Sequence, residues 1–77
     1  MQIIQSILFD KKYWTISEAN AWLERHGYIH KKIHTTDKFI RYRQHEPNYN
    51  RYHYITKKLP NHTELILGFP IHEFNKK

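Results

Sequence analysis

The sequence has no cysteine, only two glycines and no apolar run longer than three residues. Without cysteine there can be no disulfide, no thiolate metal site and no cysteine nucleophile. The two glycines, Gly27 and Gly68, are too far apart to form a glycine-rich phosphate-binding loop. Runs as short as Ile7-Leu8-Phe9 predict no membrane span. The opening residues are not a charged segment followed by an apolar one, so we do not expect secretion.

The length of 77 residues allows one domain with a small core. Hydrophobic residues make up 39% of the chain and aromatic residues 16%, which is typical of a folded protein rather than a disordered one. We therefore expect a single α+β domain over residues 1–70, followed by a loosely held tail at 71–77.

Positive charge is concentrated in the middle of the chain. Residues 28–58 contain eight of the thirteen Lys and Arg residues and two of the seven Asp and Glu residues, so they carry the whole net charge of +6. Five of the six tyrosines lie there as well. Clustered cations attract polyanions, and aromatic rings offer faces on which unpaired bases stack. This segment predicts nucleic acid, either DNA or RNA, as the partner; the alternative is a basic strand pair that is only a solvated surface.

One segment has a complete helix signature. Thr15 can cap a helix whose Glu18 reaches back to it, and Gly27 can end it. Between these residues the apolar side chains recur at helical spacing. The pattern predicts a helix over 15–26, with Trp14 and Trp22 in the core rather than on a ligand surface.

The remaining segments alternate with a period of two and are separated by turn residues. They predict five strands, at residues 2–9, 28–35, 38–45, 51–58 and 63–69. The expected fold is α+β, with one helix packed on a curved, mainly antiparallel five-stranded sheet, in the order strand, helix and four strands.

A hairpin centred on Asn48 would pair segment 38–45 with segment 51–58. Side chains alternate between the two faces of a strand. One face of this hairpin would then carry Arg, His and Lys, and the other Tyr and Ile. We expect the helix to cover the Tyr and Ile face. A slip of one residue would exchange the two faces.

The candidate nucleic-acid-binding residues are basic side chains and one tyrosine in a turn: Lys31, Lys32, Arg41, Arg43, Tyr49, Arg51, Lys57 and Lys58. Arg41 and Arg43 are two apart on a strand, so their guanidinium groups share a face at a spacing of about 6.5–7 Å, which matches adjacent phosphates. The alternative is a structural role for both arginines, paired with carboxylates of the same chain. The two lysine pairs would act by long-range attraction, and Tyr49 by stacking.

The sequence contains no arrangement typical of catalysis. His30 and His34 are four apart, which is about 13 Å along a strand and too far to share one ion. Ser17, Glu24 and His26 share one short helix but point to different faces. We therefore expect no enzymatic activity, no cofactor and no bound metal.

The order of motifs resembles a small domain of large DNA viruses of amoebae (mimivirus-like), which is similar to segments ahead of prohead-protease regions in some tailed phages. The most specific likeness is the run 39–44, Phe-Ile-Arg-Tyr-Arg-Gln, after a helix that begins Trp14-Thr15 and contains Ala19. The likeness covers roughly residues 2–69.

The resemblance implies a viral protein of the host cytoplasm or the virion. A second hypothesis follows: a virion-associated interaction or assembly module that pairs with itself or with a viral protein through exposed tyrosines and sheet edges.

Overall fold

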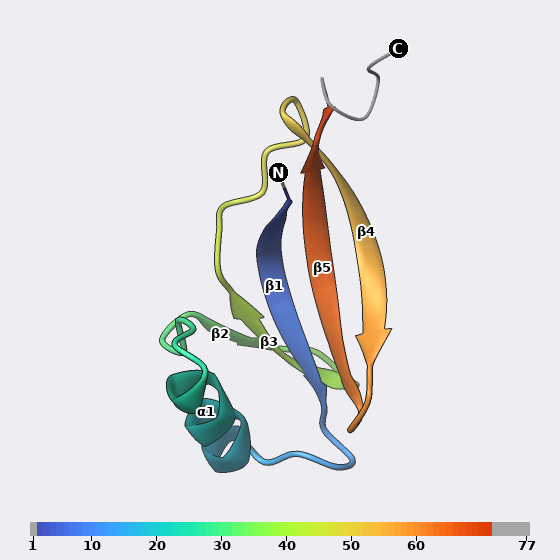
Figure 1. Cartoon of the computed structure of the whole chain (residues 1–77). Coiled ribbons are helices and arrows are strands. Elements are labelled where there is room, and N and C mark those ends of the chain that lie inside the picture. Colours follow the sequence, from blue (N-terminus) through green and yellow to red (C-terminus); the bar gives the residue numbers. More distant parts are fainter. Residues whose placement is uncertain (1, 72–77) are drawn as a thin grey trace.

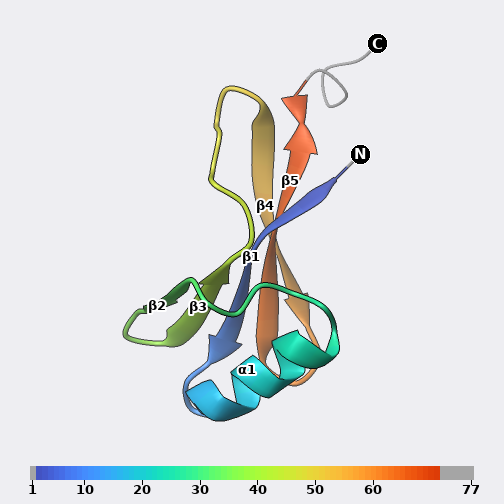
Figure 2. The same ribbon diagram turned by 90° about the vertical axis from the view of Figure 1, so that its left-hand side faces the viewer.

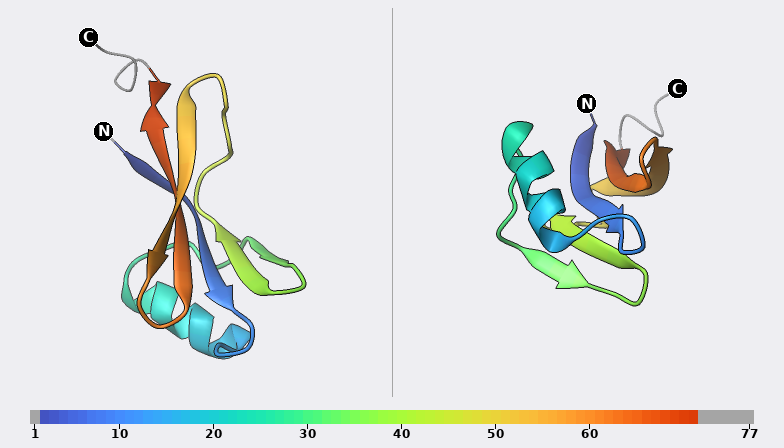
Figure 3. Two further views of the ribbon diagram at one scale, coloured as in Figure 1. Left: turned by 90° about the vertical axis from the view of Figure 1, so that its right-hand side faces the viewer. Right: turned by 90° about the horizontal axis from the view of Figure 1, so that it is seen from below.

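A computed structural model of the protein describes residues 2–71 (Figure 1). Five strands form one antiparallel sheet in the order β2-β3-β1-β5-β4. The one helix of this part of the chain covers one end of the sheet, and β4 and β5 continue beyond it (Figures 2 and 3). The elements are β1 (Ile3–Asp10), α1 (Ile16–Arg25), β2 (Ile33–Thr35), β3 (Phe39–Arg43), β4 (Tyr52–Leu59) and β5 (Thr63–Pro70).

The α+β architecture and the order of elements predicted from the sequence are confirmed. Of the predicted C-terminal tail, Ile71 donates its backbone N–H to the Arg51 carbonyl at 2.9 Å, and residues 72–77 lie outside the described residues. The described part of the chain has no helix that is both long enough and apolar enough to cross a membrane.

The helix begins and ends as its sequence predicts. Thr15 accepts a hydrogen bond from the Glu18 backbone at 3.1 Å, and the Glu18 carboxylate accepts one from the Thr15 backbone at 3.0 Å. This reciprocal pair satisfies two backbone N–H groups that the first turn cannot pair by itself. At the other end, Gly27 has a φ of 77°, a conformation that glycine adopts without steric cost.

The core lies between α1 and the half of the sheet formed by β1 and β3. Phe9 is at its centre and makes edge-on contacts with the rings of Trp14, Trp22 and Tyr42, at centroid distances of 4.8, 5.6 and 5.6 Å. Both tryptophans are half-buried against this cluster, in agreement with the core role predicted for them. The fully buried members of the core are Ile7, Phe9, Ala19, Leu23, Ile40 and Tyr42.

The predicted hairpin between segments 38–45 and 51–58 is wrong. β3 pairs with β1 and β2, while β4 pairs with β5. Pairing with β1 places Ile40 opposite Phe9 and Tyr42 opposite Ile7, so that four apolar side chains are buried together under α1. β4 buries less apolar area than this, since five of its eight residues are exposed.

The predicted strand at 28–35 is shortened to β2, and residues 28–32 form a connection instead. Tyr28 stacks on Trp22 at a centroid distance of 6.1 Å, which holds the start of this segment against the helix. The Gln44 side chain then takes the place of a strand partner: its amide nitrogen donates to the Ile29 carbonyl at 2.8 Å, and its oxygen accepts from the Ile29 N–H at 2.9 Å. A side chain thus satisfies the backbone groups that a strand ladder would otherwise pair.

Tyr42 provides a test of this core. Its hydroxyl donates to Asn20 Oδ1 at 2.7 Å, and burial raises its pKa above 10.0. We expect Tyr42→Phe to lower the free energy of unfolding by about 1 kcal/mol, because the half-buried Asn20 acceptor loses its donor. Tyr42 loses its proton at a lower pH in the unfolded chain than in the folded protein, so the stability of the wild type falls as the pH rises past 10.0. Phenylalanine has no hydroxyl to ionise, so the variant should not show this part of the decrease.

Urea denaturation followed by circular dichroism from neutral to alkaline pH measures both effects. Tyr49→Phe, at a ring that is 75% exposed, is the matched control. Equal neutral-pH stability for Tyr42→Phe and wild type would contradict this role of the hydroxyl.

Candidate nucleic-acid interface

A β-bulge interrupts β1, the central strand of the sheet. In the pairing of β1 with β5, Ile4 is opposite Leu67 and Ser6 is opposite Ile66, so Gln5 is an extra residue without an opposite partner. A bulge breaks the alternation of side chains and turns one of them toward a new direction. Here two consecutive polar residues, Gln5 and Ser6, are 2% and 0% exposed.

These two buried side chains hold the guanidinium group of Arg41. Arg41 Nε donates to Ser6 Oγ at 3.1 Å, and Arg41 Nη2 donates to Gln5 Oε1 at 3.0 Å. Ser6 Oγ also donates to Gln5 Oε1 at 2.7 Å, while Gln5 Nε2 donates to the His45 carbonyl at 2.8 Å. Every acceptor in this network is neutral, so the network fixes Arg41 without cancelling its positive charge.

Arg41 faces an open cavity of about 600 Å³, which we call the basic hollow. Two of its lining residues, Ile33 and Pro47, are apolar, and none of the lining residues, all of which lie within the described part of the chain, is acidic. The polar lining residues are Gln5, Lys31, Lys32, His34, Arg41 and Arg43.

Basic side chains are neighbours across the strands that form this hollow. His34 is directly opposite Arg41, and the backbone N–H of Arg43 donates to the Lys32 carbonyl at 3.1 Å, which continues the same register and places the charged residues Lys32 and Arg43 opposite each other. Like charges at opposite positions of a sheet destabilise it. An anion bound in the hollow would remove this repulsion, so the arrangement favours a negatively charged ligand.

Among the described residues, the carboxylate paired with one of these cations, that of Glu46, lies at the surface. Arg43 Nη2 lies 3.5 Å from Glu46 Oε2, and the two side chains are 44% and 72% exposed. A pair this open to water contributes little to stability, so the Glu46 carboxylate can give way to a phosphate. Among the described residues, Lys31, Lys32 and Arg41 form no ion pair with a carboxylate.

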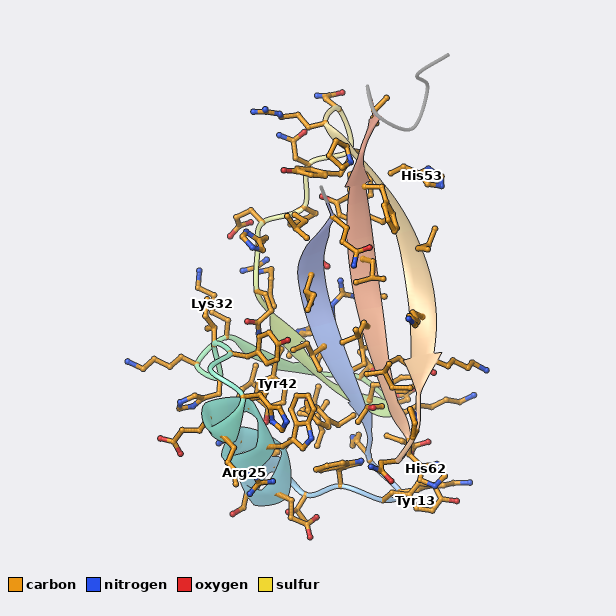
Figure 4. The ribbon with its side chains drawn as sticks, viewed as in Figure 1. Tyr13, Arg25, Lys32, Tyr42, His53 and His62 are labelled. Atoms are coloured by element: carbon orange, nitrogen blue, oxygen red, sulfur yellow. The ribbon has the colours of Figure 1, made fainter. Side chains whose placement is uncertain are left out.

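The connections on both sides of the hollow are held by the backbone of β1 and by Gln44. The Gln5 carbonyl accepts from the backbone N–H groups of Gln44 and His45, at 2.7 and 3.2 Å. The Gln44 side chain in turn holds Ile29, which directly precedes the segment with the two lysines. Lys32 extends from this connection, above α1 in the view of Figure 4.

The structure brings four of the predicted site residues together and separates the other four. Lys31, Lys32, Arg41 and Arg43 line the basic hollow. Lys57 and Lys58 lie on β4, three strands away from β3, and point to opposite faces because Lys57 is in register with Leu65 and Lys58 with Glu64.

Tyr49 and Arg51 are in the connection that precedes β4. The Tyr49 ring is 75% exposed and packs edge-on against Tyr54 at a centroid distance of 5.2 Å. The Arg51 side chain is exposed, and its backbone carbonyl accepts from Ile71. The predicted continuous hairpin face of Arg, Lys and Tyr side chains is therefore wrong, because β1 and β5 lie between β3 and β4.

Within β3 itself the predicted division of faces is confirmed. Ile40 and Tyr42 are buried toward α1, while Arg41 and Arg43 point to the other side. The structural alternative for the arginines holds for Arg43, which pairs with the Glu46 carboxylate, whereas Arg41 is held by the neutral oxygens of Ser6 and Gln5. The phosphate-binding role of both arginines stays a prediction.

Three polar residues of the site were not among the sequence candidates: Gln5, Ser6 and His34. A signal for the first two was present, because two adjacent polar residues interrupt an otherwise apolar strand. Their role depends on the bulge and on the β1–β3 pairing, which the local pattern does not contain. His34 gave no separate signal among seven histidines.

Across residues 2–71, no three His, Asp or Glu side chains are grouped as metal ligands would be. Comparison with known proteins found no matching family model, no matching curated protein and no matching solved structure. The resemblance to the viral domain stays a prediction that rests on the motifs themselves.

The network below Arg41 is tested by Gln5→Leu. The substitution keeps the approximate volume but removes the partners of Arg41, Ser6 and the His45 carbonyl. Because these polar groups stay buried or half-buried, we expect the free energy of unfolding to fall by about 1–3 kcal/mol. Urea denaturation measures the change.

Gln2→Leu is the matched control, because Gln2 is exposed and should tolerate the change. Wild-type stability in Gln5→Leu would show that the network does not hold this part of the sheet.

Proposed function

We propose that this is a small viral nucleic-acid-binding protein that contacts phosphates through the basic hollow. The observation that carries the proposal is the convergence of Lys31, Lys32, Arg41 and Arg43 on one cavity with no acidic lining residue in the described chain. Phosphates neutralised by Lys and Arg release counterions, and this release supplies most of the affinity of sequence-independent binding.

Each cation of the hollow is suited to a different part of this task. Arg41 is half-buried and fixed, so it can donate to a phosphate in a defined geometry. Lys31 and Lys32 are exposed on long flexible stems, so they contribute charge rather than precise contacts. Arg43 exchanges its weak contact with Glu46 for a phosphate.

The viral origin and the location in host cytoplasm or virion belong to the same proposal. Their support is the motif order that runs from the Trp14-Thr15 helix start to the segment 39–44. That segment is β3 with Gln44, so the most specific part of the resemblance supplies both the core residues Ile40 and Tyr42 and the two arginines of the hollow.

The proposal is tested with two matched double variants. Lys31→Gln with Lys32→Gln removes two charges at the hollow, and Lys57→Gln with Lys58→Gln removes two charges on β4. We expect the first pair to flatten the slope of log K against log salt by about one to two units, because up to two phosphate contacts are lost, and the second pair to change it much less. Fluorescence anisotropy with single- and double-stranded DNA and RNA measures the slopes.

Equal effects of the two pairs would mean that charge acts diffusely rather than through the hollow. The absence of binding to all four nucleic acids at low salt would refute the proposed function.

The second candidate function is assembly through the edge of the sheet. Among the described strands β4 has β5 as its one neighbour, so β4 is an edge strand, and the part of it that follows His53 can pair with another strand. Ile55 on β4 is 43% exposed, which adds an apolar contact at this edge.

Assembly predicts a dimer whose fraction rises with concentration in light scattering. Ile55→Lys should shift the protein to monomer, because it places a charge at the centre of the new strand pair. A wild-type protein that is monomeric at high concentration would exclude self-association through this edge.

A further inference from the structure

The basic hollow concentrates more positive charge than one backbone phosphate requires. Four Lys and Arg side chains and His34 surround a single cavity of about 600 Å³. Phosphodiesters along an extended strand each carry one negative charge and lie about 6–7 Å apart, a spacing that Arg41 and Arg43 on β3 match by themselves. Lys31 and Lys32 line the same cavity from the connection before β2, and this larger group of cations matches a ligand group that carries more than one negative charge at one point.

The phosphomonoester at the end of a nucleic-acid strand is such a group. It carries about −1.5 to −2 charges at neutral pH and presents three acceptor oxygens. A phosphodiester within the strand offers a single charge and two such oxygens. A terminal phosphate can also enter a concave site, because the chain continues from one side of it only.

Arg41 is prepared to bind this group. An arginine has five N–H donors in a planar fork. The donors on Nε and Nη2 that face the sheet are held by Ser6 and Gln5, and no hydrogen bond of Nη1 to another described residue is formed. The fork is thus immobilised before a ligand arrives, and the entropy of fixing it is already lost in the folded protein.

The hollow also has a place for the nucleoside that carries the phosphate. Pro47 is an exposed apolar member of its lining, whereas Ile33 is in register with Tyr42 and lines the hollow from a strand position whose side chain lies on the other face. The cavity volume of about 600 Å³ falls in the range of small-molecule sites, so one terminal nucleotide fits within it.

We propose that the basic hollow recognises the terminal phosphomonoester of a nucleic-acid strand. In this arrangement Arg41 binds the phosphate, Gln5 positions Arg41, and Lys31, Lys32 and Arg43 supply the remaining charge. The inference rests on the proposed function and adds the chemical group that the site selects.

The test compares oligonucleotides of one sequence that differ only at their ends. The probes carry a hydroxyl at both ends, a 5′-phosphate, or a 3′-phosphate, with the fluorophore on the opposite end, and anisotropy gives the affinities. We expect at least one phosphorylated end to bind about tenfold tighter than the hydroxyl form, because charge-assisted hydrogen bonds to Arg41 are gained.

Equal binding of all three probes overturns this inference and leaves the proposed function standing, whereas no binding of any probe refutes the proposed function itself. A nucleoside monophosphate serves as competitor. The strand-end proposal expects it to displace the phosphorylated probe only at much higher concentration, and displacement at equal concentration would identify a free nucleotide as the ligand and overturn it.

Arg41→Lys tests whether Arg41 is the residue that recognises the terminal phosphate. The variant keeps the charge but loses the planar fork, so the preference for a phosphorylated end should disappear. Because Arg41 also contacts backbone phosphates in the proposed function, binding of the hydroxyl probe should weaken too, but by less than binding of the phosphorylated probe. Lys57→Gln, on β4, should keep the preference. Circular dichroism verifies that each variant is folded, and an unchanged end preference in folded Arg41→Lys would overturn the role of Arg41.

Discussion

The pairing of β3 with β1 is the constraint on which both the core and the candidate site depend. It places Ile40 and Tyr42 opposite Phe9 and Ile7, where α1 covers all four side chains. Because side chains alternate along a strand, the same register turns the arginines of β3 to the other face. There they meet the bulge in β1, whose two polar residues fix Arg41. Apolar burial on one face of β3 therefore builds the cationic site on the other.

The site keeps features that a sheet selected for stability alone would avoid. Gln5 and Ser6 occupy fully buried positions in the central strand, and an extra residue interrupts the ladder beside β5. Basic side chains face each other across β2 and β3 with no acidic residue among the described lining residues. Such departures from local consistency are typical of functional sites, where binding requires groups that folding by itself would not favour.

The aromatic residues of the basic segment have mostly structural roles. Tyr42 is in the core and Tyr28 stacks on Trp22. Tyr54 lies so close to Gly68 that a Cβ atom there would be 2.8 Å from its ring, which explains why a glycine stands at this position. The exposed Tyr49 ring rests against Tyr54. The abundance of tyrosine is thus a property of the fold, and the charge distribution is the better guide to function.

The sequence by itself determined the helix with both of its ends, the number and approximate positions of the strands, and the separation of Ile40 and Tyr42 from the two arginines of β3. These features depend on local capping chemistry and on the period of side chains along one segment. Only the tertiary structure decided that β1 pairs with β3, that Gln5 forms a bulge, and that Lys31 and Lys32 join Arg41 while Lys57 and Lys58 do not. Strand partners are selected by the apolar area that distant segments bury together. The pattern within one segment does not contain this area, because it depends on both segments.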